Sequence, residues 1–214
     1  QAFVDAHIVP RIGDWHREVD EGQLPVSFVE ELKTSARSEG LWNLFLPGLR
    51  DDEPGTALTN LEYAPLAEIM GRVSWASEIF NCSAPDTGNM ELLHLFATPE
   101  QYQEWLLPLL NGEIRSAFAM TEPDVASSDP TQLQTTATLE GGDWIIRGHK
   151  WFTSGANRAA YTTVMCRTEP DAADHDAFSM IIVPTDTPGY DIVRDVKVMG
   201  HQSGHCEVRY RDVR

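Results

Sequence analysis

The stretch FAMTEPDVASSD, residues 118–129, marks the point where the character of the chain changes. Its first residues have the composition of a strand, Pro123 interrupts that strand, and hydroxyl groups follow at Ser127 and Ser128. A loop of this kind offers backbone amides and hydroxyls to an anionic or heteroaromatic ligand. Taken alone, the same pattern is more often a capped surface turn. The sequence on either side therefore decides how this stretch is interpreted.

The chain before this stretch has the pattern of helices. Val26, Val29, Leu32 and Ala36 recur at intervals of three and four residues, and Gly40 stands where such a helix would stop. This spacing predicts an amphipathic helix.

Two capping boxes predict further helix starts. They are Thr59 with Glu62 and Thr98 with Gln101. We expect the apolar stripe that follows the second box to end at Pro108.

The chain after residues 111–112 has the pattern of strands. Apolar residues alternate over 133–139, Gly141 and Gly142 supply a turn, and residues 144–147 form a return strand. Further β-rich segments are residues 161–167, 178–183 and 205–210, and the acidic residues 171–176 are expected to form a solvated hairpin loop. We therefore predict an α+β chain, with an all-α helical domain over 1–113 and a β-barrel-like domain over 114–214.

Composition limits the classes of function. The 214 residues are 42% hydrophobic and 23% charged, which is typical of a globular protein. No apolar run is long enough to cross a bilayer, so we expect no membrane insertion. The net charge of −17, from 16 basic and 33 acidic residues, argues against nucleic-acid binding. Three cysteines without a CxxC pair suggest buried thiols and a cytoplasmic location.

A second polar stretch, HKWFTSGAN over residues 149–157, also departs from a core strand. Two aromatic side chains beside hydroxyls and a glycine can form a platform with a hydrogen-bonding edge, which suits a flat ring. The alternative is a strand end whose aromatic residues belong to the core. No GxGxxG or P-loop sequence is present, so a nucleotide cofactor would need another kind of site.

Together the two stretches resemble the acyl-CoA dehydrogenase family. MTEP at 120–123 is similar to the family's Thr-Glu-Pro motif, and KWFT at 150–153 is similar to its later Lys-x-Trp-Ile-Thr-type strand. The resemblance extends over essentially the whole chain, from residues 3–10 to residues 200–214. The segments APDTGNM (84–90) and DVASS (124–128) resemble the branch that is fused in animals to a kinase-like domain.

The resemblance implies a flavin site. In the family, the segment that matches Phe118 to Ser128 lies along the isoalloxazine ring of FAD. The backbone near Met120 and Thr121, with the Thr121 hydroxyl, would hydrogen-bond the pyrimidine edge of that ring. Ser128 would meet the acyl-CoA, and Ser127 is the alternative because this branch has one extra residue.

The second motif would contribute the other side of the flavin site. Trp151 would pack near the flavin face, and the Thr153 hydroxyl would approach the flavin N5. Position 152 is Phe where most members have Ile, a change of volume that the pocket must absorb.

The reaction that the resemblance implies is α,β-dehydrogenation of an acyl-CoA thioester. The family's catalytic glutamate lies in a C-terminal helical domain that we expect to be absent from this chain, so no residue here is assigned as catalytic. Glu122 is expected to be structural. An electron-transfer flavoprotein-type acceptor and a homodimer or homotetramer are the implied partners. An acyl-CoA oxidase on the same fold and a non-catalytic acyl-CoA- or partner-binding module are the alternatives.

The remaining polar residues carry weaker signals. His201 and His205 have the spacing of two metal ligands, but the glycines around them argue against a helix, so no metal is expected. His94 is interpreted as a satisfied, partly buried histidine. Lys150 is expected to extend from a strand end into solvent.

Overall fold

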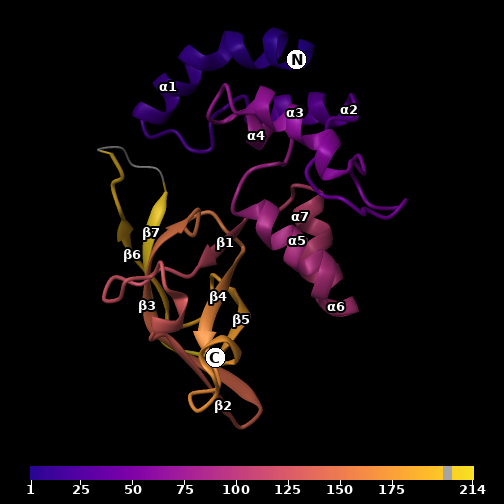
Figure 1. Ribbon diagram of the computed structural model, residues 1–214. Coiled ribbons are helices and arrows are strands. Elements are labelled where there is room, and N and C mark those ends of the chain that lie inside the picture. The colour runs from indigo at the N-terminus through magenta and orange to yellow at the C-terminus, as the bar shows by residue number, and fades with distance from the viewer. Residues whose placement is uncertain (200–203) are drawn as a thin grey trace. The chain divides into compact units, whose positions relative to one another are not determined.

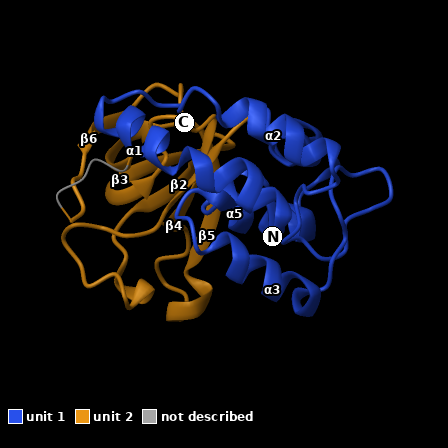
Figure 2. Cartoon of the chain, turned by 90° about the horizontal axis from the view of Figure 1, so that it is seen from above, with its two compact units in different colours: residues 1–113 blue, residues 114–214 orange. Residues whose placement is uncertain are grey.

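The computed structural model describes residues 1–199 and 204–214. The chain divides into two compact units, residues 1–113 and residues 114–214 (Figure 2). The first is helical and the second is a curled β-sheet, so the predicted fold class is confirmed. Among the described residues, no helix combines the length and the apolar run that crossing a bilayer requires.

The helical unit is built from short helices, and side chains cap the starts of α3 (Asn60–Met70) and α6 (Pro99–Gln101). Both predicted capping boxes are present: the Thr59 side chain accepts from the Glu62 amide and the Thr98 side chain accepts from the Gln101 amide. The helices among the described residues are α1 (Ile12–Asp20), α2 (Val29–Ser38), α3 (Asn60–Met70), α4 (Ala76–Ile79), α5 (Asp86–Phe96), α6 (Pro99–Gln101) and α7 (Leu107–Leu110), with π-helical turns at Val4–Ile8 and Tyr102–Leu106 and a 3-10 turn at Val9–Arg11 (Figure 1).

The core of this unit follows the predicted apolar stripe of α2. Val26, Val29, Leu32 and Ala36 are all buried. The prediction for Pro108 is wrong: it lies in the first turn of α7, and the helix continues to Leu110. Helical turns run without a break from Pro99 to Leu110, and Pro108 comes directly after the π-helical turn Tyr102–Leu106, where i→i−5 bonding already replaces the regular pattern that a proline would break.

The second unit is one sheet of seven strands. Its bounds among the described residues are β1 (Ser116–Ala119), β2 (Thr136–Glu140), β3 (Asp143–Ser154), β4 (Tyr161–Arg167), β5 (Phe178–Pro184), β6 (Tyr190–Asp195) and β7 (His205–Val213) (Figure 1). The strand order is β1-β4-β2-β3-β7-β6, and β5 pairs with β4. The β1–β4 pair is parallel and the β3–β7 pair is antiparallel.

Local sequence signals set the hairpins of this sheet. The β2–β3 turn is formed by Gly141 and Gly142, which both have positive φ. The predicted acidic hairpin loop joins β4 and β5, is largely exposed and contains the 3-10 turn Asp174–Asp176. The three cysteines, Cys82, Cys166 and Cys206, are free and buried, as the composition predicted.

Candidate functional site

A β-bulge lies in β3 at the second of the two polar stretches. The cross-strand pairs on either side of it are Lys150 with Val208 and Thr153 with Cys206. Two residues of β3, Trp151 and Phe152, therefore lie opposite a single residue of β7. Phe152 has φ 53°, the left-handed conformation that the extra residue adopts here. A bulge of this kind redirects the side chains that follow it.

The bulge separates buried polar groups from accessible aromatic ones. Lys150 and Thr153 are both fully buried, although in a regular strand residues three apart face opposite sides. Trp151 is half-buried and Phe152 is 40% exposed. The centroids of these two rings are 4.6 Å apart. The predicted aromatic platform is therefore partly accessible at this strand end and is not part of the core.

The structure brings the two polar stretches together. The Trp151 amide donates to the Thr121 carbonyl at 3.0 Å, so the loop after β1 is joined to the bulge of β3. Phe118 lies on β1, half-buried, and Met120 and Thr121 follow it, also half-buried. These residues are those that the sequence analysis grouped into one site.

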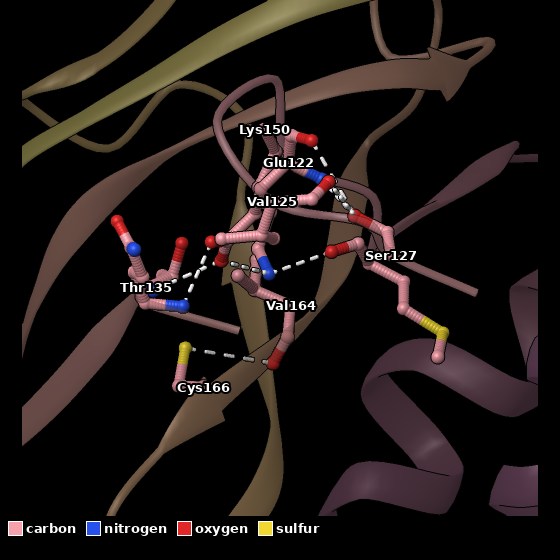
Figure 3. Close-up of polar contacts among 9 residues, drawn as sticks. Glu122, Val125, Ser127, Thr135, Lys150, Val164 and Cys166 are labelled. Carbon is pink, nitrogen blue, oxygen red and sulfur yellow. Dashed lines mark hydrogen bonds and ion pairs between the residues drawn. The ribbon is translucent and has the colours of Figure 1, made fainter. Parts of the chain in front are cut away.

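Lys150 is the clearest error of the sequence analysis. Its ammonium group is buried, not in solvent, and donates to the Met120 carbonyl at 2.8 Å and to Glu122 Oε1 at 2.9 Å (Figure 3). Glu122 lies 28 positions earlier in the chain, so no local pattern indicated the pair. A lysine that alternates with polar and aromatic neighbours gives no sign of which face is buried.

Glu122 has the structural role that was expected of it. Its carboxylate accepts from the amides of Gln134 at 2.7 Å and Thr135 at 2.9 Å as well as from Lys150 (Figure 3). Burial alone would raise the pKa of this carboxyl, but the hydrogen bonds from Thr135, Lys150 and Gln134 outweigh burial and hold the pKa below its usual value. Burial lowers the pKa of the Lys150 ammonium, because a cation loses its hydration there.

The two serines of the loop have different surroundings. Ser127 Oγ accepts from the Glu122 amide at 2.9 Å and closes the turn that follows β1 (Figure 3). Ser128 is exposed. Of the two, Ser128 has the hydroxyl that is open to a ligand from outside.

A polar cluster that the sequence analysis missed lies on β3, β6 and β7. His149 Nε2 is 2.8 Å from Glu207 Oε1, and Arg194 Nε donates to Glu207 Oε2 at 2.6 Å. The bond from Arg194, helped by His149, holds the pKa of Glu207 below its usual value. Nearby on the same strands, Ser154 Oγ is 2.7 Å from His205 Nδ1. The alternation of residues 205–210 predicts that His205 and Glu207 share one face of β7. Their partners on β3 and β6 follow only from the register of the sheet.

The weaker histidine predictions have mixed outcomes. His201 lies outside the described residues. Over the part of the chain that is described, no group of three His, Cys, Asp or Glu side chains has the arrangement of a metal site. His94 is partly buried as expected, with 14% of its side chain exposed, but its Nδ1 lies 3.7 Å from Glu53 Oε2, beyond hydrogen-bond distance.

Two family models match the chain. The acyl-CoA dehydrogenase N-terminal domain matches residues 1–113, and the middle domain of the same family matches residues 117–213. The chain belongs to the acyl-CoA dehydrogenase family. A probable acyl-CoA dehydrogenase of Mycobacterium tuberculosis is 56% identical over 87% of this chain and 46% of the relative. The chain thus spans about half the length of this family member.

Other members of the acyl-CoA dehydrogenase family support the same assignment. Mouse acyl-CoA dehydrogenase family member 10 is 51% identical over 89% of this chain and 18% of its own length, so the animal branch that the motifs indicated is represented. A structure titled as an acyl-CoA dehydrogenase of Mycobacterium abscessus is 43% identical, with a TM-score of 0.90 over 99% of this chain and 55% of that one. A glutaryl-CoA dehydrogenase of Mycobacterium smegmatis in complex with FADH2 is 25% identical, with a TM-score of 0.75 over 99% of this chain and 50% of that one.

Proposed function

We propose that this chain contributes the helical and middle domains to an FAD-dependent enzyme that desaturates acyl-CoA thioesters between Cα and Cβ. The observation that carries the proposal is the joining of the two motif segments, where the Trp151 amide bonds the Thr121 carbonyl. Membership in the acyl-CoA dehydrogenase family and the FADH2-bound relative support FAD as the cofactor.

The residues at this junction fit a flavin. Thr153 Oγ1 is buried and has no hydrogen-bond partner among the described residues. A buried hydroxyl without a partner costs folding free energy, and a hydrogen bond to a cofactor heteroatom at the bulge would remove that cost. The Trp151 and Phe152 rings beside it offer the apolar surface that a flat ring requires. The Met120 and Thr121 carbonyls already accept hydrogen bonds within the unit, so amides and the Thr121 hydroxyl are what this loop would offer to the pyrimidine edge.

When bound, FAD would supply the hydride acceptor for the β-hydrogen of the thioester. Trp151 and Phe152 would pack against the ring and exclude water. The Thr153 hydroxyl would donate toward N5 of the oxidised ring and so make that ring a better hydride acceptor. Ser128 would contact the acyl-CoA, because the Ser127 hydroxyl is already bonded to the Glu122 amide.

No side chain of this chain is proposed as the base that removes the α-proton. Glu122, the acidic residue nearest the bulge in the motif, is fully engaged with Lys150, Gln134 and Thr135. We place the base in a part of the enzyme outside these 214 residues. An electron-transfer flavoprotein-type acceptor and a homodimeric or homotetrameric enzyme complete the proposal.

A Thr153→Val substitution in the full-length protein tests this assignment. The purified parent should show the visible absorption bands of a flavin, and these should bleach when acyl-CoA is added without oxygen. Thr153→Val should keep the flavin and slow its reduction by about 10²-fold or more, the usual effect of removing one preorganised donor. Thr34→Val, which changes an exposed threonine of α2, is the matched control and should leave the rate unchanged.

The same experiment separates the alternatives. A parent that stays colourless with added FAD would overturn the proposal. Binding of acyl-CoA without bleaching would indicate a non-catalytic module, and rapid reoxidation of the reduced protein by O₂ would indicate an acyl-CoA oxidase. Equal reduction rates in Thr153→Val and the parent would remove Thr153 from the mechanism.

A further inference from the structure

A buried ion pair joins the two proposed flavin-contact segments. Lys150 Nζ and Glu122 Oε1 are 2.9 Å apart (Figure 3), and both side chains are buried. We propose that this pair is a positioning device, which fixes the spacing between the loop at 120–128 and the bulge at 151–153 and thereby the shape of the flavin cradle. The inference rests on the proposed function and adds to it two residues that touch neither cofactor nor substrate.

The contacts of the pair reach three separate pieces of backbone. Lys150, on β3, donates to the carbonyl of Met120 at the end of β1. Glu122 accepts from the amides of Gln134 and Thr135, which precede β2. The pair therefore ties together the end of β1, the entrance to β2 and the middle of β3.

The pair also acts in parallel with a backbone bond. Glu122 follows Thr121 in the chain, and Lys150 precedes Trp151, whose amide donates to the Thr121 carbonyl. Two adjacent ties, one between side chains and one between backbones, hold the same two strand ends. The Glu122 amide in addition donates to Ser127 Oγ, so this one residue also closes the turn that leads to Ser128.

Stability alone does not explain a charged pair at this place. Apolar residues of similar volume often give a fold equal or greater stability than a buried ion pair, because the pair must be desolvated. Charged groups instead impose direction, since each one has to meet defined partners at defined angles. Burial raises the pKa of the neighbouring Cys166 thiol to about 12, so this thiol is neutral and does not compete with Glu122 for the ammonium group.

A Lys150→Met substitution in the full-length protein is the first test. The control is Lys33→Met, because Lys33 is also a buried lysine paired with carboxylates, those of Glu30 at 2.8 Å and Glu78 at 3.6 Å, but belongs to the helical unit. With folding verified by circular dichroism, Lys150→Met should weaken FAD binding by about tenfold or more, since a loosened site loses its preorganisation. Lys33→Met should stay within about twofold of the parent, because Lys33 belongs to the other compact unit and its ion-pair partners are not those of Lys150.

Amide hydrogen exchange gives a readout that does not depend on the flavin. In Lys150→Met without added FAD, exchange should accelerate at the amides of Trp151, Gln134 and Thr135, and not at the amides of the α2 core. Unchanged exchange at these three amides would overturn the positioning role, whether or not the protein binds FAD. A parent that binds no FAD would overturn the proposed function instead, and with it the flavin part of this inference.

A double variant separates positioning from stability. Lys150→Met leaves Glu122 as a buried charge without its partner, and Lys150→Met with Glu122→Gln removes that charge. The double variant should therefore regain much of the lost thermal midpoint while its affinity for FAD stays weak. Recovery of FAD affinity together with the thermal midpoint would reduce the pair to a structural role and overturn the proposal.

Discussion

Glu122 is the residue whose titration the fold controls most directly. Its hydrogen bonds from Thr135, Lys150 and Gln134 keep its pKa below the usual 4.5 in spite of burial. A carboxyl with a lowered folded-state pKa stabilises the fold above its unfolded pKa, and that stabilisation is lost as the pH falls through the folded-state pKa. We expect Glu122→Gln to lower the free energy of unfolding at pH 7 by about 3 kcal/mol, because it leaves the Lys150 ammonium buried without its charge partner.

The stability of the same variant should depend less on acid pH than that of the parent. When urea midpoints are measured at pH 7, 5 and 4, the midpoint of Glu122→Gln should fall less between pH 7 and pH 4 than the midpoint of the parent. Glu30→Gln is the matched control, since Glu30 also pairs with a lysine but its side chain is 70% exposed. A carboxylate as exposed as that of Glu30 contributes little to stability, so this control should follow the parent. Parallel curves for Glu122→Gln and the parent would contradict the assignment of a lowered pKa to Glu122.

The turn before β6 depends on a glycine at a point of close approach. Gly189 has φ +90°, and a Cβ built on it would lie 2.2 Å from the Arg211 carbonyl oxygen. Gly142, in the β2–β3 turn, has a similar φ of +99° but nothing within 4 Å of its added Cβ. Gly189→Ala should therefore cost about 1–3 kcal/mol more unfolding free energy than Gly142→Ala, because only the first adds a clash to the strained φ. Equal urea midpoints for the two variants would contradict this.

The whole chain carries a net charge of −17, and mutual repulsion of its carboxylates opposes compaction. At 0.1 M salt the Debye length is about 10 Å, so repulsion between exposed carboxylates farther apart than this is largely screened. The thermal midpoint of the chain should therefore rise as NaCl is increased from low ionic strength to 0.3 M, with a sugar at matched osmolality as the control for water activity. A midpoint that falls with NaCl would show instead that exposed pairs, such as Arg211 with Asp191 at 3.1 Å, outweigh the repulsion.

Most local signals in the sequence predicted local structure correctly, although Pro108 does not end its helix. The caps at Thr59 and Thr98 and the turn at Gly141 and Gly142 each depend on residues that are close together in the chain, and all are present. The residues of the flavin site stay predictions, although the structure places the two stretches together. Lys150 was misplaced because its burial depends on a partner on another segment. A distant partner leaves no trace in spacing or periodicity.

The bulge in β3 decides which of the residues that follow it face inward. In a regular strand, a lysine and a threonine have to be two or four residues apart to share one face. Here they are three apart, and the left-handed Phe152 restores the phase so that Lys150 and Thr153 both point inward. Removal of the extra residue at the bulge would therefore turn every later residue of β3 to the opposite face of the sheet.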